Sequence, residues 1–371
     1  MNGKKRVIDS DGHVVETERT WDFMEPSDAK FRPYIATEKN AKNGRPREQW
    51  VIDGRMVRGV RNPLSAKEQE KLYESTGRMV TTPDGAVEME DIGARLRHMD
   101  QLGIDMQVLH STMFITATCA RPDTDVAVAK GYNRWMADIW RQSEGRLRYT
   151  AQLPYLAIDE AVKELRWAAA NGACAGAIRP IERDMLCGVP YFYPVFEEAA
   201  RLGIPMAMHL GNGNPEFHAL LSRGKSGSPF SFRIPTMSAL HWLVWSEVAD
   251  VFPTLRFGIF ESGADWVPFV LKDLKRRFPT QHPTLKTLPD NIMKEKRIYV
   301  ACEASDDLSY IIQYAGEDNL VCGTDYGHTD QASELDALRE LGARTGVSQT
   351  VVDKILCDNP ATLFGFKGAD F

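Results

Sequence analysis

The sequence predicts an α/β protein, a (β/α)8 TIM barrel with an insertion after the first strand. Three observations predict it: eight short apolar segments alternate with helical periodicity, they are apolar enough to be buried on both faces, and most end in a polar residue. Such parallel strands close into a barrel whose reactive groups lie at the strand ends. The alternative is an open doubly wound sheet. Against it, the chain has neither G-x-G-x-x-G after its first strand nor G-x-x-x-x-G-K-[ST].

The predicted elements follow one another regularly from residue 85 onward, and we treat residues 1–371 as one domain. The eight strands are predicted at 7–15, 104–110, 147–153, 173–179, 204–210, 255–261, 297–303 and 320–325. The helices between them are predicted at 92–102, 124–142, 159–170, 192–202, 237–251, 265–278 and 306–315.

Residues 17–84 interrupt this alternation, with mixed charge and no sustained helical period. Within them, Asp53-Gly54 between apolar residues predicts a β-hairpin at 50–57. We interpret the segment as an insertion that acts as a lid over a site. A solvated embellishment without a role in binding is the alternative. Trp21 and Trp50 could supply flat apolar walls for a planar substrate, or pack the insertion onto the barrel.

Composition favours small-molecule chemistry. The net charge is −6 and neither sign forms a long run, which argues against a nucleic-acid or anionic-membrane surface. No stretch could span a bilayer, and the apolar run after the basic start is too short for a signal peptide, so we expect a cytoplasmic protein. The six cysteines show no C-x-x-C pairing, which favours buried free thiols.

The first strand ends in polar residues spaced two apart. Asp9, Asp11 and His13 therefore share one face of a strand. His209 and Asp325 close the fifth and eighth strands. We predict that Asp11, His13, His209 and Asp325 bind one divalent metal ion. Two imidazoles and two carboxylates suit Zn²⁺, and the oxygen count also admits Mn²⁺ or Mg²⁺.

Further polar residues close other strands, including His110, Arg179, Glu261 and Glu303. Buried without partners, they would be costly, whereas a shared ion and a polar substrate would satisfy them. Arg179 is the candidate partner for a substrate carboxylate, because the paired N–H donors of its guanidinium match the two oxygens of a carboxylate. His328 and Trp50 are weaker candidates for substrate contact.

Several motifs, taken together, resemble the amidohydrolase-2 family of the amidohydrolase superfamily. They are Asp9-Ser10-Asp11-Gly12-His13, His209, Phe260-Glu261-Ser262-Gly263-Ala264-Asp265-Trp266, Gly323-Thr324-Asp325-Tyr326-Gly327-His328 and Asn359-Pro360-Ala361. The resemblance covers nearly the whole chain except the insertion. The branch it points to contains aminocarboxymuconate-semialdehyde decarboxylase, γ-resorcylate decarboxylase and related non-oxidative decarboxylases, beside uncharacterised hydrolases.

The resemblance implies a distorted barrel with one metal ion and, usually, a homodimer. It matches His209 and Asp325 to metal ligands. Asp11 stands where many members have a histidine, and Gly327 replaces the usual proline. The resemblance also implies that His241 is an acid/base near the metal. Glu261 matches the glutamate of an E-x-G motif and is a third candidate catalytic residue, beside His241 and Asp325.

The function expected from the resemblance is metal-dependent, non-oxidative decarboxylation of a small aromatic or unsaturated carboxylate. His241 and Asp325 would then manage protons. The alternative is a hydrolase of the same superfamily, in which a metal-activated water attacks a carbonyl or cyclic substrate. A third hypothesis is a noncatalytic barrel that binds a ligand or partner.

Overall fold

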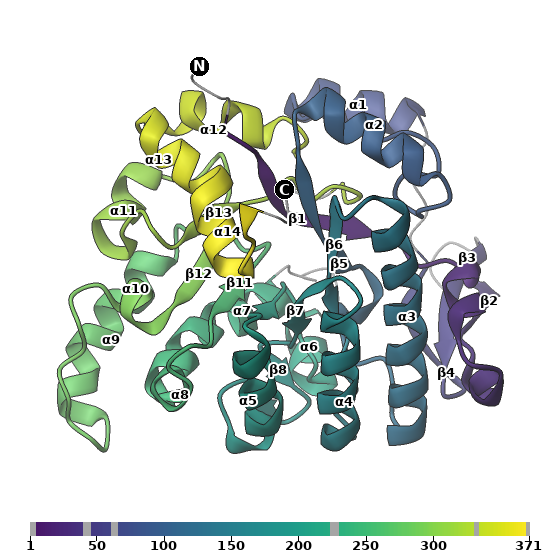
Figure 1. The fold of residues 1–371 in the computed structure, drawn as a ribbon, viewed down its shortest axis with the longest axis horizontal. Helices are drawn as coiled ribbons and strands as arrows, with labels where there is room; N and C mark the ends of the chain where they lie inside the picture. The colour runs from purple at the N-terminus through teal and green to yellow at the C-terminus, as the bar shows by residue number, and fades with distance from the viewer. Residues whose placement is uncertain (1–4, 40–45, 61–65, 223–229, 330–333, 369–371) are drawn as a thin grey trace.

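The computed structural model describes residues 5–39, 46–60, 66–222, 230–329 and 334–368. One eight-stranded sheet forms its centre, and every pairing between neighbouring strands is parallel. In order around the sheet, the strands are β1 (Ile8–Val14), β5 (Met106–Ser111), β6 (Leu147–Ala151), β7 (Ala173–Ala177), β10 (Met206–Met208), β11 (Phe257–Ile259), β12 (Ile298–Cys302) and β13 (Leu320–Cys322). The predicted (β/α)8 barrel is therefore confirmed (Figure 1).

The barrel is nearly closed where its last strand returns to its first. The amide of Asp325 donates to the carbonyl of Asp11 at 2.8 Å, and the amide of His13 donates to the carbonyl of Tyr326 at 2.7 Å. Both contacts lie just beyond the carboxyl end of β13. The junction thus falls where the predicted metal ligands stand.

Helices surround this sheet (Figure 1). The main ones are α2 (Ile92–Leu102), α3 (Pro122–Gln142), α4 (Ile158–Ala169), α5 (Tyr193–Leu202), α7 (Phe230–Trp245), α9 (Val267–Gln281) and α11 (Leu308–Ala315). The helix predicted at 237–251 is divided, because α7 ends at Trp245 and a short α8 (Val248–Val251) follows Glu247, whose φ is 55°. Helices α6 (Pro215–Ser222) and α12 (Ala337–Thr345) to α14 (Asn359–Phe364) were not predicted.

Two apolar layers form the core. The larger lies between the sheet and the helices. The smaller fills the barrel and includes Ala207 and Val321. Phe364 of α14 joins the inner layer and stacks on Phe260 with ring centroids 6.1 Å apart. Asn359 of α14 donates to the carbonyl of Leu320 at the start of β13, so α14 covers the amino-terminal end of the barrel.

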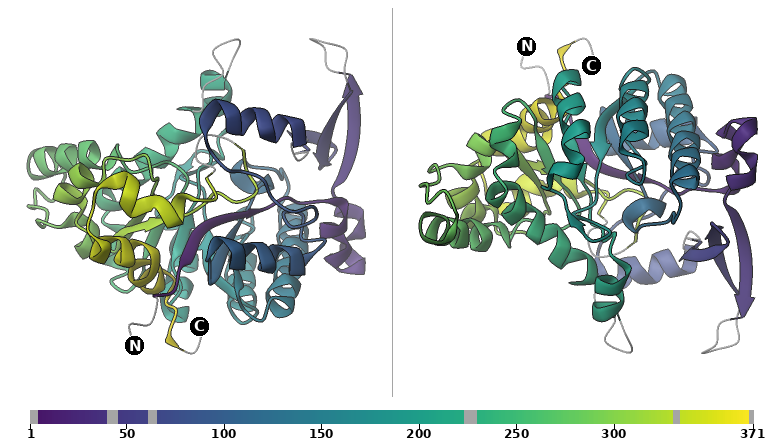
Figure 2. Two further views of the ribbon diagram at one scale, coloured as in Figure 1. Left: turned by 90° about the horizontal axis from the view of Figure 1, so that it is seen from above. Right: turned by 90° about the horizontal axis from the view of Figure 1, so that it is seen from below.

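The insertion consists of two 3-10 helices, η1 (Glu18–Phe23) and η2 (Pro26–Phe31), a three-stranded antiparallel sheet and helix α1 (Ala66–Thr76). Its strands are β2 (Tyr34–Lys39), β3 (Pro46–Ile52) and β4 (Arg55–Gly59), and β3–β4 confirms the predicted hairpin. Figure 2 shows this sheet at the edge of the molecule, where η1 and η2 pack against α3.

The turn of this hairpin is tied to the loop that follows β5. Asp53 and Gly54 both have a positive φ, of 54° and 68°, as a tight hairpin turn requires. The Asp53 carboxylate accepts hydrogen bonds from the amides of Ala120 and Arg121 at 2.8 and 3.3 Å. These contacts hold the hairpin to the amino-terminal end of α3. The lid interpretation stays a prediction.

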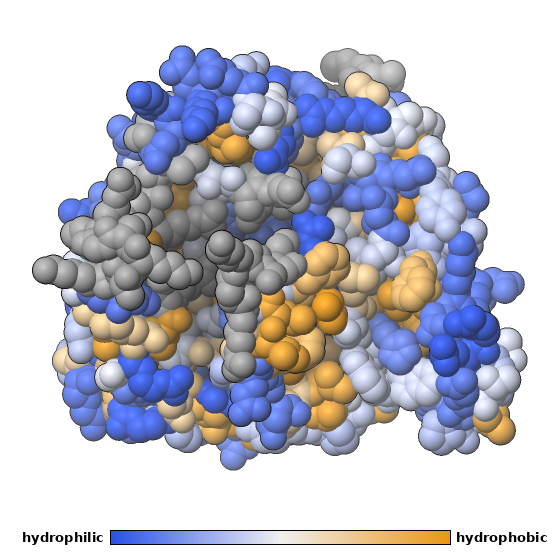
Figure 3. All heavy atoms as spheres, turned by 180° about the vertical axis from the view of Figure 1, so that it is seen from behind, coloured by the Kyte–Doolittle hydropathy of each residue, from blue (hydrophilic) through white to orange (hydrophobic). Residues whose placement is uncertain are grey.

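The face shown in Figure 3 is largely hydrophilic, with hydrophobic residues gathered beside its centre. Helices α6 and α7 expose Leu220, Phe230 and Ile234. Among the described residues, no helix combines the length and apolar character that a bilayer span requires. The homodimer and the cytoplasmic location stay predictions. All six cysteines are free thiols and five are buried.

Trp50 provides a test of how the insertion is attached. Its side chain is 3% exposed and packs edge-to-face on Trp21, with ring centroids 6.1 Å apart. We expect Trp50→Ala to lower the free energy of unfolding by about 3–5 kcal/mol, since it removes a large buried ring. Denaturant unfolding measures this. Tyr34→Ala on the exposed face of β2 is the control, expected to change it by less than about 0.5 kcal/mol. An unchanged stability for Trp50→Ala would contradict the packing role.

Candidate metal centre

Six ionisable side chains converge at the carboxyl ends of the barrel strands. Asp11 and His13 come from β1, and the other four lie one to six residues beyond the ends of β10, β11 and β13. The residues are Asp11, His13, His209, Glu261, Asp325 and His328. They form two overlapping groups of four, and the ligand atoms of each group lie within 4.8 Å of one another. All six are wholly or largely buried.

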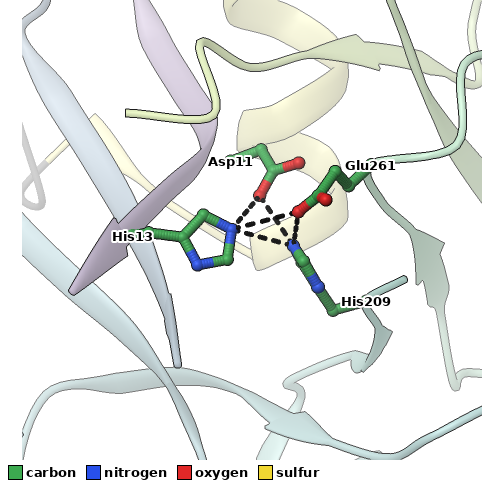
Figure 4. Close-up of side chains that lie close together, drawn as sticks. All are labelled: Asp11, His13, His209 and Glu261. Carbon is green, nitrogen blue, oxygen red and sulfur yellow. Dashed lines mark hydrogen bonds and ion pairs between the residues drawn. The ribbon is translucent and has the colours of Figure 1, made fainter. Parts of the chain in front are cut away.

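The first group is shown in Figure 4, where the four side chains point toward a common centre. His13 Nε2 lies 3.0 Å from His209 Nε2. His209 Nε2 lies 2.9 Å from Glu261 Oε2 and 3.3 Å from Asp11 Oδ1. Two imidazole nitrogens and two carboxylate oxygens therefore surround one point.

The second group shares His13 and Glu261 with the first. Asp325 Oδ1 lies 3.2 Å from His13 Nε2, and His328 Nδ1 lies 2.8 Å from Asp325 Oδ1. The His328 ring stacks on the His13 ring, with centroids 3.7 Å apart and an interplanar angle of 22°. The structure thus brings together the four predicted ligands, Asp11, His13, His209 and Asp325, and adds Glu261 and His328.

The backbone around the cluster is close-packed and strained. A Cβ atom on Gly323 would lie 2.7 Å from the backbone nitrogen of Asp11, so only glycine allows β13 to approach β1 this closely. Glu261 and Asp325 adopt left-handed conformations with φ of 56° and 48°. Such backbone costs about 1–3 kcal/mol at a non-glycine residue and persists only where the surroundings enforce it.

A buried network below the cluster supplies that enforcement. The Asp9 carboxylate accepts hydrogen bonds from the amide and the hydroxyl of Thr324, at 3.0 and 2.6 Å, and from the Gln107 side chain at 2.5 Å. Arg95 donates to Gln107 and to the carbonyl of His13. Asp9 thus holds β13 against β1, while its neighbours on the motif, Asp11 and His13, face the cluster.

Burial disfavours every charge at the cluster, and neighbouring groups decide which charges persist. Burial alone would lower the pKa of His209, but the carboxylates of Glu261 and Asp11 outweigh it and raise that pKa well above its usual value. Burial would raise the pKa of Glu261, yet His209 and His13 hold it well below its usual value. Without an ion, His209 therefore retains a proton at neutral pH.

A cation fits this arrangement. Asp11 Oδ1 and Glu261 Oε2 are buried, and neither accepts a hydrogen bond of normal geometry from a described residue. Buried carboxylate oxygens without donors are costly, and a divalent ion between them removes that cost. Ligands bound to one ion at about 2.0–2.3 Å are roughly 3–3.5 Å apart, which matches the separations of 2.9–3.6 Å in the first group.

A cavity adjoins the cluster. His110 and His209 form the side nearest the cluster, and Phe114, Tyr155 and Arg179 lie on its walls. Burial lowers the pKa of His110 to about 3, against the opposing pull of Asp11, so this imidazole is neutral. The sequence places His110 at a strand end without assigning it a role.

Arg179 lines this cavity, but its guanidinium is already engaged. Nε and Nη2 donate to the two oxygens of Glu182 at 2.6 and 2.7 Å, and Nη1 donates to the carbonyl of Phe114 at 2.8 Å. The structure therefore pairs Arg179 with a carboxylate of the chain itself. Its observed contacts brace the loop that carries Phe114.

The structure does not bring two other predicted residues to the cluster. The His241 ring on α7 is half-buried and stacks on Trp245, with centroids 5.2 Å apart and an interplanar angle of 16°. Burial lowers the pKa of His241, and the charged groups that act on it are Asp273 and Arg277 of α9. Trp50 packs in the core of the insertion and is not among the residues lining the cavity.

Comparison with known proteins places this geometry in a family. The profile of the amidohydrolase family matches residues 8–366, so the chain belongs to that family. The family is metal-dependent, and the chain is an enzyme of this family.

Solved structures share the fold at low sequence identity. An amidohydrolase from Mycobacterium avium subsp. paratuberculosis K-10 is 19% identical with a TM-score of 0.76, and each chain is covered completely. The 5-carboxyvanillate decarboxylase of Sphingomonas paucimobilis is 18% identical with a TM-score of 0.68, over 98% of this chain and 100% of that one. A dihydroxybenzoic acid decarboxylase from Polaromonas sp. JS666, solved with manganese and 2-nitroresorcinol, is 16% identical with a TM-score of 0.66, over 99% of both chains.

Gly323 offers a direct test of the close approach between β1 and β13. We expect Gly323→Ala to lower the free energy of unfolding by about 1–3 kcal/mol through overpacking, and to weaken metal binding because the ligands of the two strands separate. Denaturant unfolding and chelator competition measure the two effects. Gly368→Ala is the matched control, since a Cβ there meets nothing within 4 Å. Equal behaviour of the two variants would contradict the requirement for glycine.

The raised pKa of His209 predicts that metal binding releases protons. The metal-free protein holds a proton on His209 at pH 7, and the ion must displace it, so affinity increases as the pH rises toward that pKa and levels off above it. We expect about one proton per ion at pH 7, measured by calorimetry in two buffers of different ionisation enthalpy. A heat of binding independent of the buffer would refute this assignment.

Proposed function

We propose that this protein is a metal-dependent, non-oxidative decarboxylase of a small aromatic or unsaturated carboxylate. The observation that carries the proposal is the buried cluster of carboxylates and imidazoles beside a cavity lined by aromatic and polar side chains. The 5-carboxyvanillate and dihydroxybenzoic acid decarboxylases of the same fold support the proposal.

We assign the ion to Asp11, His13 and His209, with Asp325 and Glu261 beside them. When bound, the ion supplies a positive charge that holds an anionic substrate and withdraws electrons from it. Zn²⁺ suits the two imidazoles, and Mn²⁺ or Mg²⁺ suits the carboxylate oxygens. Glu261, expected from the sequence as a catalytic residue, acts in this assignment through its contact with His209 at 2.9 Å.

The chain's own residues must move one proton. Protonation of the carbon that bears the carboxylate makes it tetrahedral. The bond to the carboxylate then breaks, its electron pair restores conjugation, and CO2 leaves. We assign the proton transfer to Asp325, whose Oδ1 lies at the centre of the cluster, 2.8 Å from His328 Nδ1 and 3.2 Å from His13 Nε2.

The cavity walls supply binding and orientation. Phe114 and Tyr155 offer apolar surfaces for a planar substrate. Arg179 fixes the carbonyl of Phe114 and so holds one wall in place. The sequence interpretation of Arg179 as the substrate's own carboxylate partner has less support, because Glu182 occupies both Nε and Nη2.

A hydrolase is the second candidate. The observation that favours it is the excess of carboxylates, since Asp325 could take a proton from an attacking water at the same centre. The Mycobacterium amidohydrolase of the same fold is consistent with that reading. Both candidates use the same residues at the cluster.

The proposal is tested with a panel of hydroxybenzoates and muconate-type acids, with CO2 release as the readout. We expect turnover with added Zn²⁺ or Mn²⁺, loss of turnover with a chelator, and a decrease of about 10²–10⁴-fold for Asp325→Asn, which removes the proton-transfer group. Asp123→Asn, an exposed carboxylate at the start of α3, is the control and should keep full activity.

Hydrolysis of a lactone, amide or C–C bond without CO2 release would replace the proposal by the second candidate. If neither reaction occurs, and His209→Ala leaves the metal content unchanged, the third hypothesis of a noncatalytic barrel stands.

A further inference from the structure

We infer that His328 is an additional ligand of the metal ion, through Nδ1, and that Thr112 is the positioning residue that presents it. The inference rests on the metal centre of the proposed function and extends it by two residues. His328 follows β13, and Thr112 directly follows β5 on the neighbouring side of β1.

The hydrogen bonds of Thr112 determine which nitrogen of His328 carries hydrogen. Thr112 Oγ1 lies 2.7 Å from the carbonyl oxygen of Val14, an atom that can only accept. The single hydroxyl hydrogen of Thr112 is therefore donated to Val14. Thr112 Oγ1 also lies 3.0 Å from His328 Nε2. Because the hydroxyl has no second hydrogen, it accepts here, and Nε2 of His328 is the protonated nitrogen.

A neutral imidazole with its hydrogen on Nε2 has a lone pair on Nδ1. In His328 this lone pair faces Asp325 Oδ1 at 2.8 Å and Glu261 Oε2 at 3.6 Å. These distances require either a second proton on the ring, at Nδ1, or a cation between the three atoms. The second arrangement is the one we infer, because Nδ1 and the two oxygens belong to one group of four ligand atoms that lie within 4.8 Å of one another. The same two oxygens belong to the cluster already assigned to the ion.

Packing keeps Nδ1 in this position. The His328 side chain is almost completely buried, and its ring is stacked on His13 with centroids 3.7 Å apart. The ring plane is thereby fixed by His13 and its rotation by Thr112. Hydrogen bonding of the distal nitrogen to a fixed acceptor is the usual means by which proteins orient a metal-bound histidine.

With His328 included, the cluster offers three imidazole nitrogens and three carboxylate oxygens. That is more than the three or four donors that a tetrahedral zinc site takes from protein. The larger mixed shell favours an ion of higher coordination number such as Mn²⁺.

Nuclear magnetic resonance of the full-length protein with ¹⁵N-labelled histidine and bound ¹¹³Cd²⁺ tests the inference. We expect ¹¹³Cd–¹⁵N coupling to Nδ1 of His328 and to Nε2 of His13 and His209. Coupling to His13 and His209 without coupling to His328, or a His328 ring protonated at both nitrogens, would overturn the inference while leaving the metal centre in place. Absence of coupling to every histidine would instead overturn the metal centre itself.

Metal affinity of variants tests the role of Thr112. We expect Thr112→Val to weaken Mn²⁺ binding by about 10–100-fold, the usual effect of removing such a partner, whereas Thr112→Ser keeps the hydroxyl and stays near wild type. Thr236→Val is the matched control, because Thr236 is also buried and its hydroxyl also donates to a backbone carbonyl, that of Phe232. Equal affinity of Thr112→Val and wild type, or equal weakening in Thr236→Val, would overturn the assignment.

Discussion

The site depends on one contact, the approach of the last barrel strand to the first. Two backbone hydrogen bonds, Asp325 to Asp11 and His13 to Tyr326, set the distance between the two segments that carry most of the cluster. They force like charges together, since Asp11 and Asp325 stand on opposite sides of the junction. Repulsion between these carboxylates opposes closure, whereas a cation bound between them would attract both. Closure of the barrel and binding of such an ion would therefore be coupled.

A buried hydrogen-bond network below the cluster supports this junction. Asp9 and Gln107 fix the backbone below the cluster, and Arg95 places its guanidinium over the Tyr326 ring, 3.5 Å from the ring centroid. The left-handed residue Asp325 lies between Thr324, which is bonded to Asp9, and Tyr326. Strained backbone at a functional site requires surroundings that over-determine it, and here every supporting group is buried.

Much of the candidate site could be predicted from the sequence, because side chains alternate along a strand and the pattern shows which residues share a face. Asp11, His13, His209 and Asp325 stand at the ends of apolar runs, and a parallel barrel brings strand ends to one rim. Glu261 is predicted as a strand-end and motif residue and His328 as a weaker candidate for substrate contact, and neither is predicted as a metal ligand. Their side-chain directions depend on a left-handed backbone at Glu261 and on a turn after Asp325, and neither follows a period of two. The interruption of helix 237–251 at Glu247 is likewise a left-handed turn that periodicity does not reveal.

His241 and Arg179 show two further limits. Helix α7 is apolar on nearly all sides, so its sequence does not indicate which face meets the barrel, and the His241 ring lies on Trp245. Arg179 lies two residues beyond the end of β7, which is shorter than the predicted strand 173–179, and Glu182 three residues later forms an ion pair with it. The spacing of three residues indicates this pairing, because an arginine and a glutamate so close in sequence can form an ion pair with each other.

Because the hairpin is attached through Asp53, the shape of the cavity can change independently of the cluster. The hairpin turn is bonded to Ala120 and Arg121, in the segment that begins with Phe114 and Ile115 on the cavity wall. The Asp53 carboxylate accepts its hydrogen bonds from Ala120, Arg121 and Thr124, in this same segment and the first turn of α3. Substitutions in the insertion can therefore change the shape of the cavity while leaving the cluster intact. This gives the barrel a route to new substrates without new catalytic residues.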